Sequence, residues 1–294
     1  MVRIGLIFLA LFAAEVAAEV RVATFNVRNY LVQDRRVEGR WLTNYPKPEK
    51  EKEAVQRAIM EMDADILALQ EMGPPPFLLE LQKDLREKGL DYPYAVILEA
   101  EDQDRHLAVL SKIEPETVHR HIDLDFPYGE ERIRIKRGLL EVVFPADSDS
   151  AKSWSLFVLH LKSRWSQFDW DPGSSSRREK EARAARNRIL ERYPEGEGLY
   201  LIAGDLNAHR NSAPVRRLKS RGSVQISRPV ESFDSRGEKW TYFYQKEDRY
   251  ERVDFLLTSS ELTPFVVGGE GVVFDPLYLK EGSDHRPVWL DLRF

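Results

Sequence analysis

Residues 283–288 read Ser283-Asp284-His285-Arg286-Pro287-Val288, which is the least ordinary string in the chain. The apolar run from Val288 to Leu292 that follows predicts a strand, so an acid and a histidine stand just before its start. By itself such a string is more often a structural turn than a site. Its meaning depends on whether other polar residues stand at strand ends elsewhere in the chain.

Five further segments place polar side chains beside short apolar runs. They are Thr24-Phe25-Asn26-Val27-Arg28, Leu69-Gln70-Glu71, His160-Leu161-Lys162-Ser163, Gly204-Asp205-Leu206-Asn207 and Arg252-Val253-Asp254-Phe255. Taken singly, each is more often a turn former, a solvated strand end, a core histidine or a surface ion pair. Independent accidents rarely give all six in order, and side chains at strand ends converge at one edge of a sheet. The set therefore predicts one site.

These residue types suit phosphoester hydrolysis. Mg²⁺ prefers hard oxygen ligands, which Glu71 and Asn26 supply, and it neutralises charge on the phosphate and the leaving oxygen. Asp205 is a candidate base or water-positioning group. Asn207 can hydrogen-bond the nucleophile or a phosphate oxygen.

Two histidines can donate hydrogen bonds to the phosphorus centre. His160 and His285 are both suited to contact phosphate oxygens as charge develops on them. Asp254 and Asp284 can orient His285 or shift its pKa, or add oxygens to the metal site. The predicted site is therefore a metal-assisted hydrolytic centre.

Strand and helix patterns alternate along the chain. Helices are predicted over residues 50–62, 77–88 and 176–192. Strands are predicted over residues 20–25, 66–70, 95–98, 107–110, 138–144, 155–161, 199–203, 253–258, 272–274 and 288–292. So many strands with few helices predict two sheets packed face to face, with helices outside.

Bulk composition sets limits on function. The chain has 294 residues, 42% of them hydrophobic, and no linker is evident, which favours one domain over residues 19–294. The formal net charge of -5 gives no support for a general nucleic-acid binder. Local basic patches or a bound metal can still reverse the sign at a site. The absence of Cys excludes disulfides, thiolate catalysis and Cys-ligated metal sites.

The first eighteen residues have the pattern of a secretory signal peptide. Arg3 is followed by an apolar run from Ile4 to Ala14, and small residues at 16–18 precede Glu19. The run is short for a membrane anchor. We therefore expect residues 1–18 to be removed and the protein to be secreted or periplasmic, with no stable membrane anchor.

The six ordered segments resemble those of the endonuclease/exonuclease/phosphatase superfamily, which includes DNase I-like nucleases, inositol polyphosphate 5-phosphatases, bacterial sphingomyelinases and deadenylases. The resemblance covers residues 20–294. It implies an α/β fold, a four-layer α/β/β/α sandwich of two mixed, mainly antiparallel sheets with outer helices. It also implies an Mg²⁺-dependent phosphoester hydrolase, with Mn²⁺ or Ca²⁺ as alternative ions, and we expect a monomer.

The resemblance assigns roles to individual residues. Glu71 looks like the principal metal ligand, helped by Asn26. His285 matches the catalytic histidine and Asp254 the aspartate that pairs with it. The remaining matches are Asp205 as the residue that activates or positions water, Asn207 as its partner at the phosphate, His160 as a phosphate contact, and Asp284 as a residue near the metal or the leaving group.

Two segments depart from the family pattern. Arg28 stands where abasic-site endonucleases carry an aspartate, which weakens that interpretation; many phosphatase-like members have an arginine there that can meet phosphate. Leu107 replaces a glycine of the family. Arg105 or His106, just before it, are candidate substrate contacts, although a surface loop is the more ordinary explanation.

The substrate class is left open between three hypotheses. A nuclease or phosphodiesterase acting on nucleic acid comes first, since Trp165 and neighbouring aromatic residues after His160 are suited to stacking on bases. A phosphatase or sphingomyelinase-like enzyme acting on lipid or sugar phosphates is the alternative. A non-catalytic binding protein of the same fold comes last, because every expected polar residue is present.

Overall fold

The computed structural model of the chain describes residues 19–146 and 152–294, so the predicted signal peptide of residues 1–18 lies outside the described residues. Two large sheets form the centre of the molecule. The strands of the first are β1 (Glu19–Tyr30), β4 (Ile66–Met72), β5 (Tyr94–Leu98), β6 (His106–Ser111), β16 (Ser232–Phe233), β20 (Gly271–Val273) and β21 (Val288–Arg293). Those of the second are β7 (Thr117–His121), β10 (Leu139–Pro145), β11 (Ser153–His160), β12 (Tyr200–Asp205), β15 (Arg228–Pro229) and β19 (Asp254–Thr258).

Each sheet is mixed and mainly antiparallel, as the sequence predicts. The first has the spatial order β16-β20-β21-β1-β4-β6-β5, and the second has the order β15-β19-β12-β11-β10-β7. Near the centre of each sheet lies a parallel pair, β1 with β4 and β11 with β12. Because parallel neighbours end at the same edge of a sheet, the last residues of these four strands can meet.

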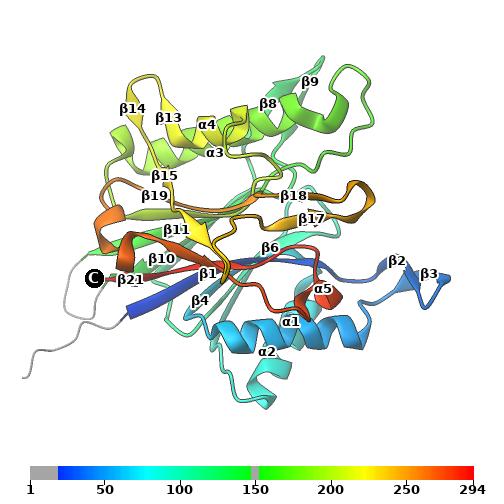
Figure 1. Cartoon of the computed structure of the whole chain (residues 1–294). Coiled ribbons are helices and arrows are strands. Elements are labelled where there is room, and N and C mark those ends of the chain that lie inside the picture. Colours follow the sequence, from blue (N-terminus) through cyan, green and yellow to red (C-terminus); the bar gives the residue numbers. More distant parts are fainter. Residues whose placement is uncertain (1–18, 147–151) are drawn as a thin grey trace, which may run out of the picture.

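Helices cover the outer faces of both sheets and complete four layers (Figure 1). On the first sheet lie α1 (Glu49–Met62) and α2 (Pro75–Glu87), and on the second lie α3 (Ser175–Arg192) and α4 (Ala213–Lys219). A single helical turn, α5 (Leu279–Gly282), precedes β21. This arrangement confirms the predicted α/β/β/α sandwich.

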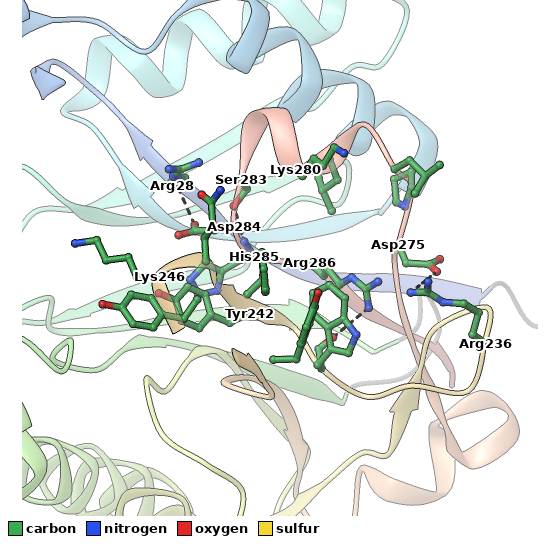
Figure 2. Close-up of a pocket in the computed structure, with 18 residues that line it drawn as sticks. Arg28, Arg236, Tyr242, Lys246, Asp275, Lys280, Ser283, Asp284, His285 and Arg286 are labelled. Carbon is green, nitrogen blue, oxygen red and sulfur yellow. Dashed lines mark hydrogen bonds and ion pairs between the residues drawn. The ribbon is translucent and has the colours of Figure 1, made fainter. Parts of the chain in front are cut away.

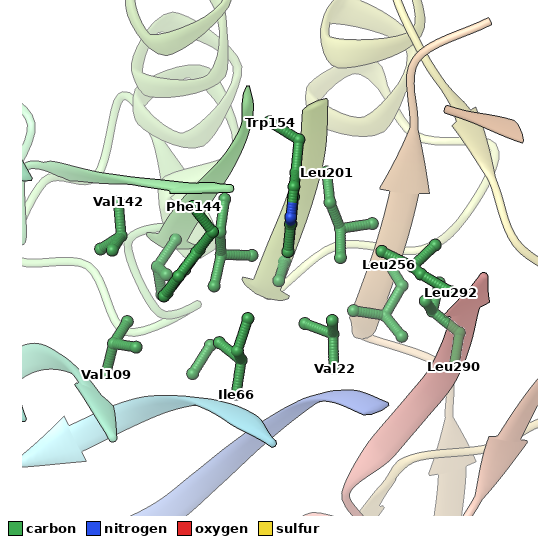
Figure 3. Packing of buried hydrophobic residues seen from close by; sticks show 14 of the residues in the cluster. Val22, Ile66, Val109, Val142, Phe144, Trp154, Leu201, Leu256, Leu290 and Leu292 are labelled. Carbon is green, nitrogen blue, oxygen red and sulfur yellow. The ribbon is translucent and has the colours of Figure 1, made fainter. Parts of the chain in front are cut away.

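The main core fills the space between the sheets (Figure 3). In β4, Ile66 and Ala68 point into this core, whereas Leu67 and Leu69 point toward the outer helices. Trp154 packs in the same core from the second sheet and is 1% exposed. Since both faces of the central strands are buried, these strands are continuous apolar runs and not alternating ones.

The outer helices are held by the apolar stripes that the sequence predicts. The buried stripe of α1 includes Ala54, Val55, Ala58, Ile59 and Met62, and that of α3 includes Ala182, Ala185 and Ile189. Each fully buried large aliphatic side chain stabilises the fold by about 1.5–3 kcal/mol relative to leaving it in water. No helix of the described segments is both long and apolar enough to cross a bilayer.

Several short hairpins were not predicted, because they are too short and polar to give a periodic signal. They are β2 (Gln33–Val37) with β3 (Arg40–Tyr45), β8 (Asp125–Tyr128) with β9 (Glu131–Arg134), β13 (Ser220–Arg221) with β14 (Val224–Gln225), and β17 (Tyr242–Tyr244) with β18 (Arg249–Glu251). The last of these hairpins proves important for the site.

Candidate active site

The predicted site residues gather where the central strands of both sheets end. Asn26 and Glu71 lie near the carboxyl ends of the parallel strands β1 and β4. His160 and Asp205 are the last residues of β11 and β12 and are direct partners in that parallel pair. Asp254 opens β19 and is the antiparallel partner of Asp205. Strand pairing fixes these side chains within each sheet, and the packing of the two sheets brings the two groups together.

An irregular backbone brings the oxygens of Asn26 and Glu71 together. Arg28, Asn29 and Glu71 have φ angles of 46°, 52° and 60°, a left-handed conformation that costs about 1–3 kcal/mol at each non-glycine residue. The N–H of Arg28 donates to Asn26 Oδ1 at 3.0 Å, and the N–H of Asn29 donates to Glu71 Oε2 at 2.9 Å. Because consecutive N–H groups hold the two acceptors, their oxygens lie side by side.

Asp205 is buried and held by three donors. Its Oδ1 accepts the N–H of Asn207 at 2.8 Å, and its Oδ2 accepts Nδ2 of Asn26 at 3.1 Å and Nδ2 of Asn207 at 3.2 Å. Burial raises the pKa of Asp205 to about 7, with the charge of His285 opposing this shift and that of Asp254 reinforcing it. The carboxyl is therefore poised to exchange a proton near neutral pH.

His285 lies between two carboxylates. Its Nδ1 is 2.9 Å from Asp254 Oδ2, and its Nε2 is 3.9 Å from Asp205 Oδ2. Although burial lowers it, the charges of Asp254 and Asp205 raise the pKa of His285 to about 10, so the ring is protonated at neutral pH. The backbone N–H of His285 donates to Ser283 Oγ at 3.0 Å, and the Ser283 hydroxyl donates in turn to the carbonyl of Asn26 at 2.8 Å.

His160 is a neutral donor on the other side of Asp205. Its Nε2 lies 3.4 Å from Asp205 Oδ2 and 4.0 Å from Glu71 Oε1. Burial, reinforced by the positive charge of Arg137, holds the pKa of His160 well below its ordinary value. The two histidines therefore differ in charge although both approach Asp205, and the difference follows from the Asp254 carboxylate, which only His285 contacts.

Arg28, Arg105 and Asp284 lie at the rim of the centre. The side chain of Arg28 is 47% exposed, and its Nε is 3.7 Å from Asp284 Oδ1. Arg105 Nε donates to Asn29 Oδ1 at 2.7 Å, and Asn29 is the residue whose backbone N–H donates to Glu71. All three are therefore connected to the segment that follows Asn26.

Two predicted substrate contacts are placed differently from the rest. His106 is 3% exposed, and by alternation along β6 its side chain is on the face that carries Ala108 and Leu110 toward the outer helices. It is therefore buried behind the sheet and does not join the others. Trp165 is 69% exposed in the loop after β11. Its ring lies 5.4 Å from Lys162 Nζ and is open to solvent.

A family model described as the Endonuclease/Exonuclease/phosphatase family matches residues 23–285, from β1 to the catalytic histidine candidate. The chain belongs to this family. Figure 2 shows where its terminal Ser-Asp-His motif meets a cavity, described below. None of the curated protein sequences matches this chain.

Solved structures of several family members and relatives share the fold. An endonuclease/exonuclease/phosphatase from Bacteroides vulgatus is 18% identical with a TM-score of 0.62, over 94% of this chain and 99% of that one. Sphingomyelinase C from Streptomyces griseocarneus is 16% identical with a TM-score of 0.62, over 94% and 100%. The catalytic domain of human Nocturnin with bound sulfate is 15% identical with a TM-score of 0.61, over 94% of each chain. At such identities the likeness shows the fold alone.

The residues present fit the divalent cation that the family generally uses. Glu71 Oε1 has no hydrogen-bond donor among the described residues, and the adjacent Asn26 Oδ1 is a second hard oxygen. Ligand atoms of Asp205, Asp254 and His285 also lie within 4.8 Å of one another. In that cluster, His285 Nδ1 is already 2.9 Å from Asp254 Oδ2, so the histidine is engaged by a carboxylate. Glu71 and Asn26 are therefore the residues that would hold the cation with free oxygen atoms.

A cavity of about 650 Å³ opens beside His285 and was not predicted (Figure 2). Its walls come from the β17–β18 hairpin and from residues 275–286. The sequence did carry a signal, since Trp240-Thr241-Tyr242-Phe243-Tyr244 is an aromatic run just before the Asp254 segment.

Lys47 is fully buried under the site and was not predicted. No signal in the sequence pointed to it, because a single lysine between two prolines is expected to be exposed on the surface.

Proposed function

We propose that the chain is an exported, Mg²⁺-dependent phosphodiester hydrolase, with nucleic acid as its first candidate substrate. The observation that carries this proposal is the position of His285, which is held by Asp254 at 2.9 Å and faces Asp205 at 3.9 Å, beside the strand end that carries Glu71. A cationic donor, a carboxyl with a pKa near neutrality and a hard-oxygen ligand are the three elements that hydrolysis of a phosphoester requires.

The histidines bind the phosphoryl group in this proposal. His285 Nε2–H donates to one non-bridging oxygen, and its positive charge stabilises the negative charge that develops there. His160 donates from Nε2 as a neutral ring, which positions the phosphate without adding charge. The two donors approach Asp205 from different strands, at 3.4 Å and 3.9 Å, so a phosphoryl group bound in front of them would face the same carboxylate.

Asp205 and Asn207 act on the attacking water. Both Nδ2 hydrogens of Asn207 are engaged, one by Leu161 O at 3.1 Å and one by Asp205 at 3.2 Å. The amide therefore orients Asp205, and its Oδ1 is left to accept a hydrogen bond from water. Asp205 takes the water proton while the water oxygen bonds to phosphorus, and the bond from phosphorus to the leaving oxygen breaks. Bound Mg²⁺ would neutralise charge on the phosphate and the leaving oxygen.

Lipid or sugar phosphates are the alternative substrates. The exposed Trp165 is consistent with a lipid surface as well as with bases. A non-catalytic binding protein is the weaker alternative, because a buried triad of opposed charges is costly to maintain without use. The pattern of residues 1–18 supports export, and we propose a monomer.

One assay tests the proposal. Residues 19–294 are incubated with DNA and RNA oligonucleotides, sphingomyelin vesicles and inositol phosphates, each with Mg²⁺ or with EDTA. We expect cleavage of oligonucleotides that needs the metal and is lost in His285→Ala. His119→Ala, on the outer strand β7, is the matched control for removing a histidine and should cleave normally. Cleavage of lipid or sugar phosphates alone would transfer the assignment to that class, and no cleavage of any of them would refute hydrolysis.

A further inference from the structure

The cavity beside His285 is built as one unit with the catalytic histidine. Residues 241–243 pair with residues 284–286 through backbone hydrogen bonds, from the N–H of Phe243 to the carbonyl of Asp284 at 3.1 Å and from the N–H of Arg286 to the carbonyl of Thr241 at 2.6 Å. The ring of Tyr242 lies 4.7 Å from that of His285. Whatever occupies the cavity therefore abuts the group that contacts the phosphate.

Aromatic rings that support one another line one wall. Phe243 stacks on Tyr250 with ring centroids 4.5 Å apart and an interplanar angle of 25°, and Tyr250 meets Trp240 edge-on at 4.8 Å. The guanidinium carbon of Arg286 lies 3.2 Å from the centroid of the Trp240 ring. The wall is thus preformed, and Tyr250 is still 53% exposed. A preformed aromatic surface binds flat rings at low entropic cost.

The remaining lining carries positive charge in a chain that is negative as a whole. Arg28, Arg236, Lys246, Lys280 and Arg286 line the cavity together with two carboxylates, Asp275 and Asp284. A third carboxylate, Asp234, pairs with Arg236 at 3.0 Å and with Arg286 at 3.1 Å, so the three arginines are balanced and the two lysines carry the excess charge. In Figure 2, Arg28 pairs with Asp284 at one end and Arg236 pairs with Asp275 at the other. Among the described residues, Lys246 and Lys280 form no ion pair, so both are available to an anion.

We propose that this cavity binds a nucleotide that flanks the scissile phosphate, with its base on the aromatic wall and its own phosphate at Lys246, on the same hairpin. A cationic headgroup such as choline would also suit aromatic rings, but the two lysines without ion-pair partners repel it. A sugar phosphate would use the cations and leave the rings in contact with water. Only a ligand with a flat ring and a negative charge, such as a nucleotide, uses both the aromatic wall and the cationic side chains. The inference rests on the proposed function and makes base recognition a property of this cavity.

Equilibrium binding in EDTA tests the cavity without any cleavage. Thymidine 5′-monophosphate, phosphocholine and inorganic phosphate are titrated into the wild type, and binding is followed by calorimetry. We expect the nucleotide to bind at least about ten-fold more tightly than phosphate, since stacking of one base is worth about 5- to 150-fold. Tyr250→Ala and Lys246→Ala should each weaken nucleotide binding. Trp41→Leu removes another exposed aromatic ring, outside the cavity, and should not weaken nucleotide binding. Equal affinity for all three probes, or tighter binding of phosphocholine, would overturn the inference.

Cleavage separates this inference from the proposed function. Rates are compared for an oligothymidylate and for the same chain with abasic spacers, in the wild type and in Tyr250→Ala and Tyr244→Leu. We expect kcat/KM to favour the base-containing chain by about ten-fold, mainly through KM, and the ratio to fall toward one in both variants. Cleavage of both chains at one rate would refute base recognition and keep hydrolysis. Nucleotide binding without cleavage of any phosphodiester would refute hydrolysis and keep the binding site.

Discussion

Lys47 Nζ donates to the carbonyl oxygen of Gly282 at 2.7 Å, across 235 residues of sequence, and to that of Arg28 at 2.9 Å. Its side chain is fully buried, and Glu51 Oε2 is its ion-pair partner at 3.3 Å. Gly282 directly precedes Ser283, and Arg28 directly follows the segment that holds Asn26. One ammonium group therefore links the segment that carries Asn26 to the segment that carries His285, and this link is called the Lys47 tether below.

Replacing this tether should cost both stability and turnover. In Lys47→Met two buried carbonyls lose their donor, at about 1–3 kcal/mol each, so the free energy of unfolding should fall by about 2 kcal/mol or more. Because the segments on both sides of the site loosen, we also expect kcat to fall about ten-fold at a temperature where the variant is fully folded. Denaturant unfolding and steady-state kinetics measure the two effects. Lys47→Arg, which keeps a donor, should recover part of both, and a change in stability with unaltered kcat would leave Lys47 a purely structural residue.

Activity should have a bell-shaped dependence on pH. Asp205 must be deprotonated to accept the water proton, and its pKa is raised to about 7. His285 must be protonated to donate, and its pKa is raised to about 10. We therefore expect kcat/KM to rise as pH increases through about 7 and to decline as it increases through about 10. A profile that is flat across both regions would contradict the assigned roles.

Asp254→Asn should shift the alkaline side of that profile. Asp254 is the strongest of the groups that raise the pKa of His285, so its loss lowers that pKa and the decline should begin at lower pH. The rate at the optimum should also fall by about 10²- to 10⁴-fold, because the ring loses its orientation and its charge. If the Asn variant had a lower rate but its activity declined at the same alkaline pH as the wild type, Asp254 would only orient the His285 ring.

Glu71→Gln should weaken the binding of Mg²⁺ while leaving the stability of the fold nearly unchanged. The amide keeps the shape of the side chain but removes the charge, and Mg²⁺ binds strongly to carboxylate and only weakly to neutral oxygens. We expect the Mg²⁺ concentration for half-maximal activity to rise at least about ten-fold, with thermal unfolding in EDTA close to that of the wild type. Titration of activity with Mg²⁺ measures this, and an unchanged half-maximal concentration would move the cation to the Asp205 cluster.

Asp234 should stabilise the fold in a defined range of pH. Burial opposes ionisation, yet hydrogen bonds from the N–H groups of Glu238 and Arg236 and from the guanidinium groups of Arg236 and Arg286 lower the pKa of Asp234 to about 2. A carboxyl with a depressed pKa stabilises the folded state above its unfolded value, here 3.8, and loses this as pH falls toward 2. Asp234→Asn should therefore reduce stability by about 2 kcal/mol at pH 7. The difference from the wild type should disappear near pH 2, and a difference that persists there would contradict the linkage.

The sequence by itself determined the layers and the members of the central site. Apolar runs of the right length predict buried strands, and stripes such as the one on α1 predict the outer helices, because both signals depend on neighbours a few positions apart. Asn26, Glu71, His160, Asp205 and Asp254 stand at strand ends, and pairing of those strands within two sheets that pack face to face brings them together. These are the residues for which local pattern and global position agree.

Tertiary structure alone decided the rest, since it depends on distances that no local pattern encodes. His106 was a candidate substrate contact, but it is the first residue of β6, and the pleat of that strand turns its side chain toward the outer helices. His160 and His285 look alike in sequence, and only the contact with Asp254 gives them different charges. The cavity by His285 and the tether at Lys47 join segments far apart in the chain, and such contacts arise from packing of the whole sandwich and not from any stretch of it.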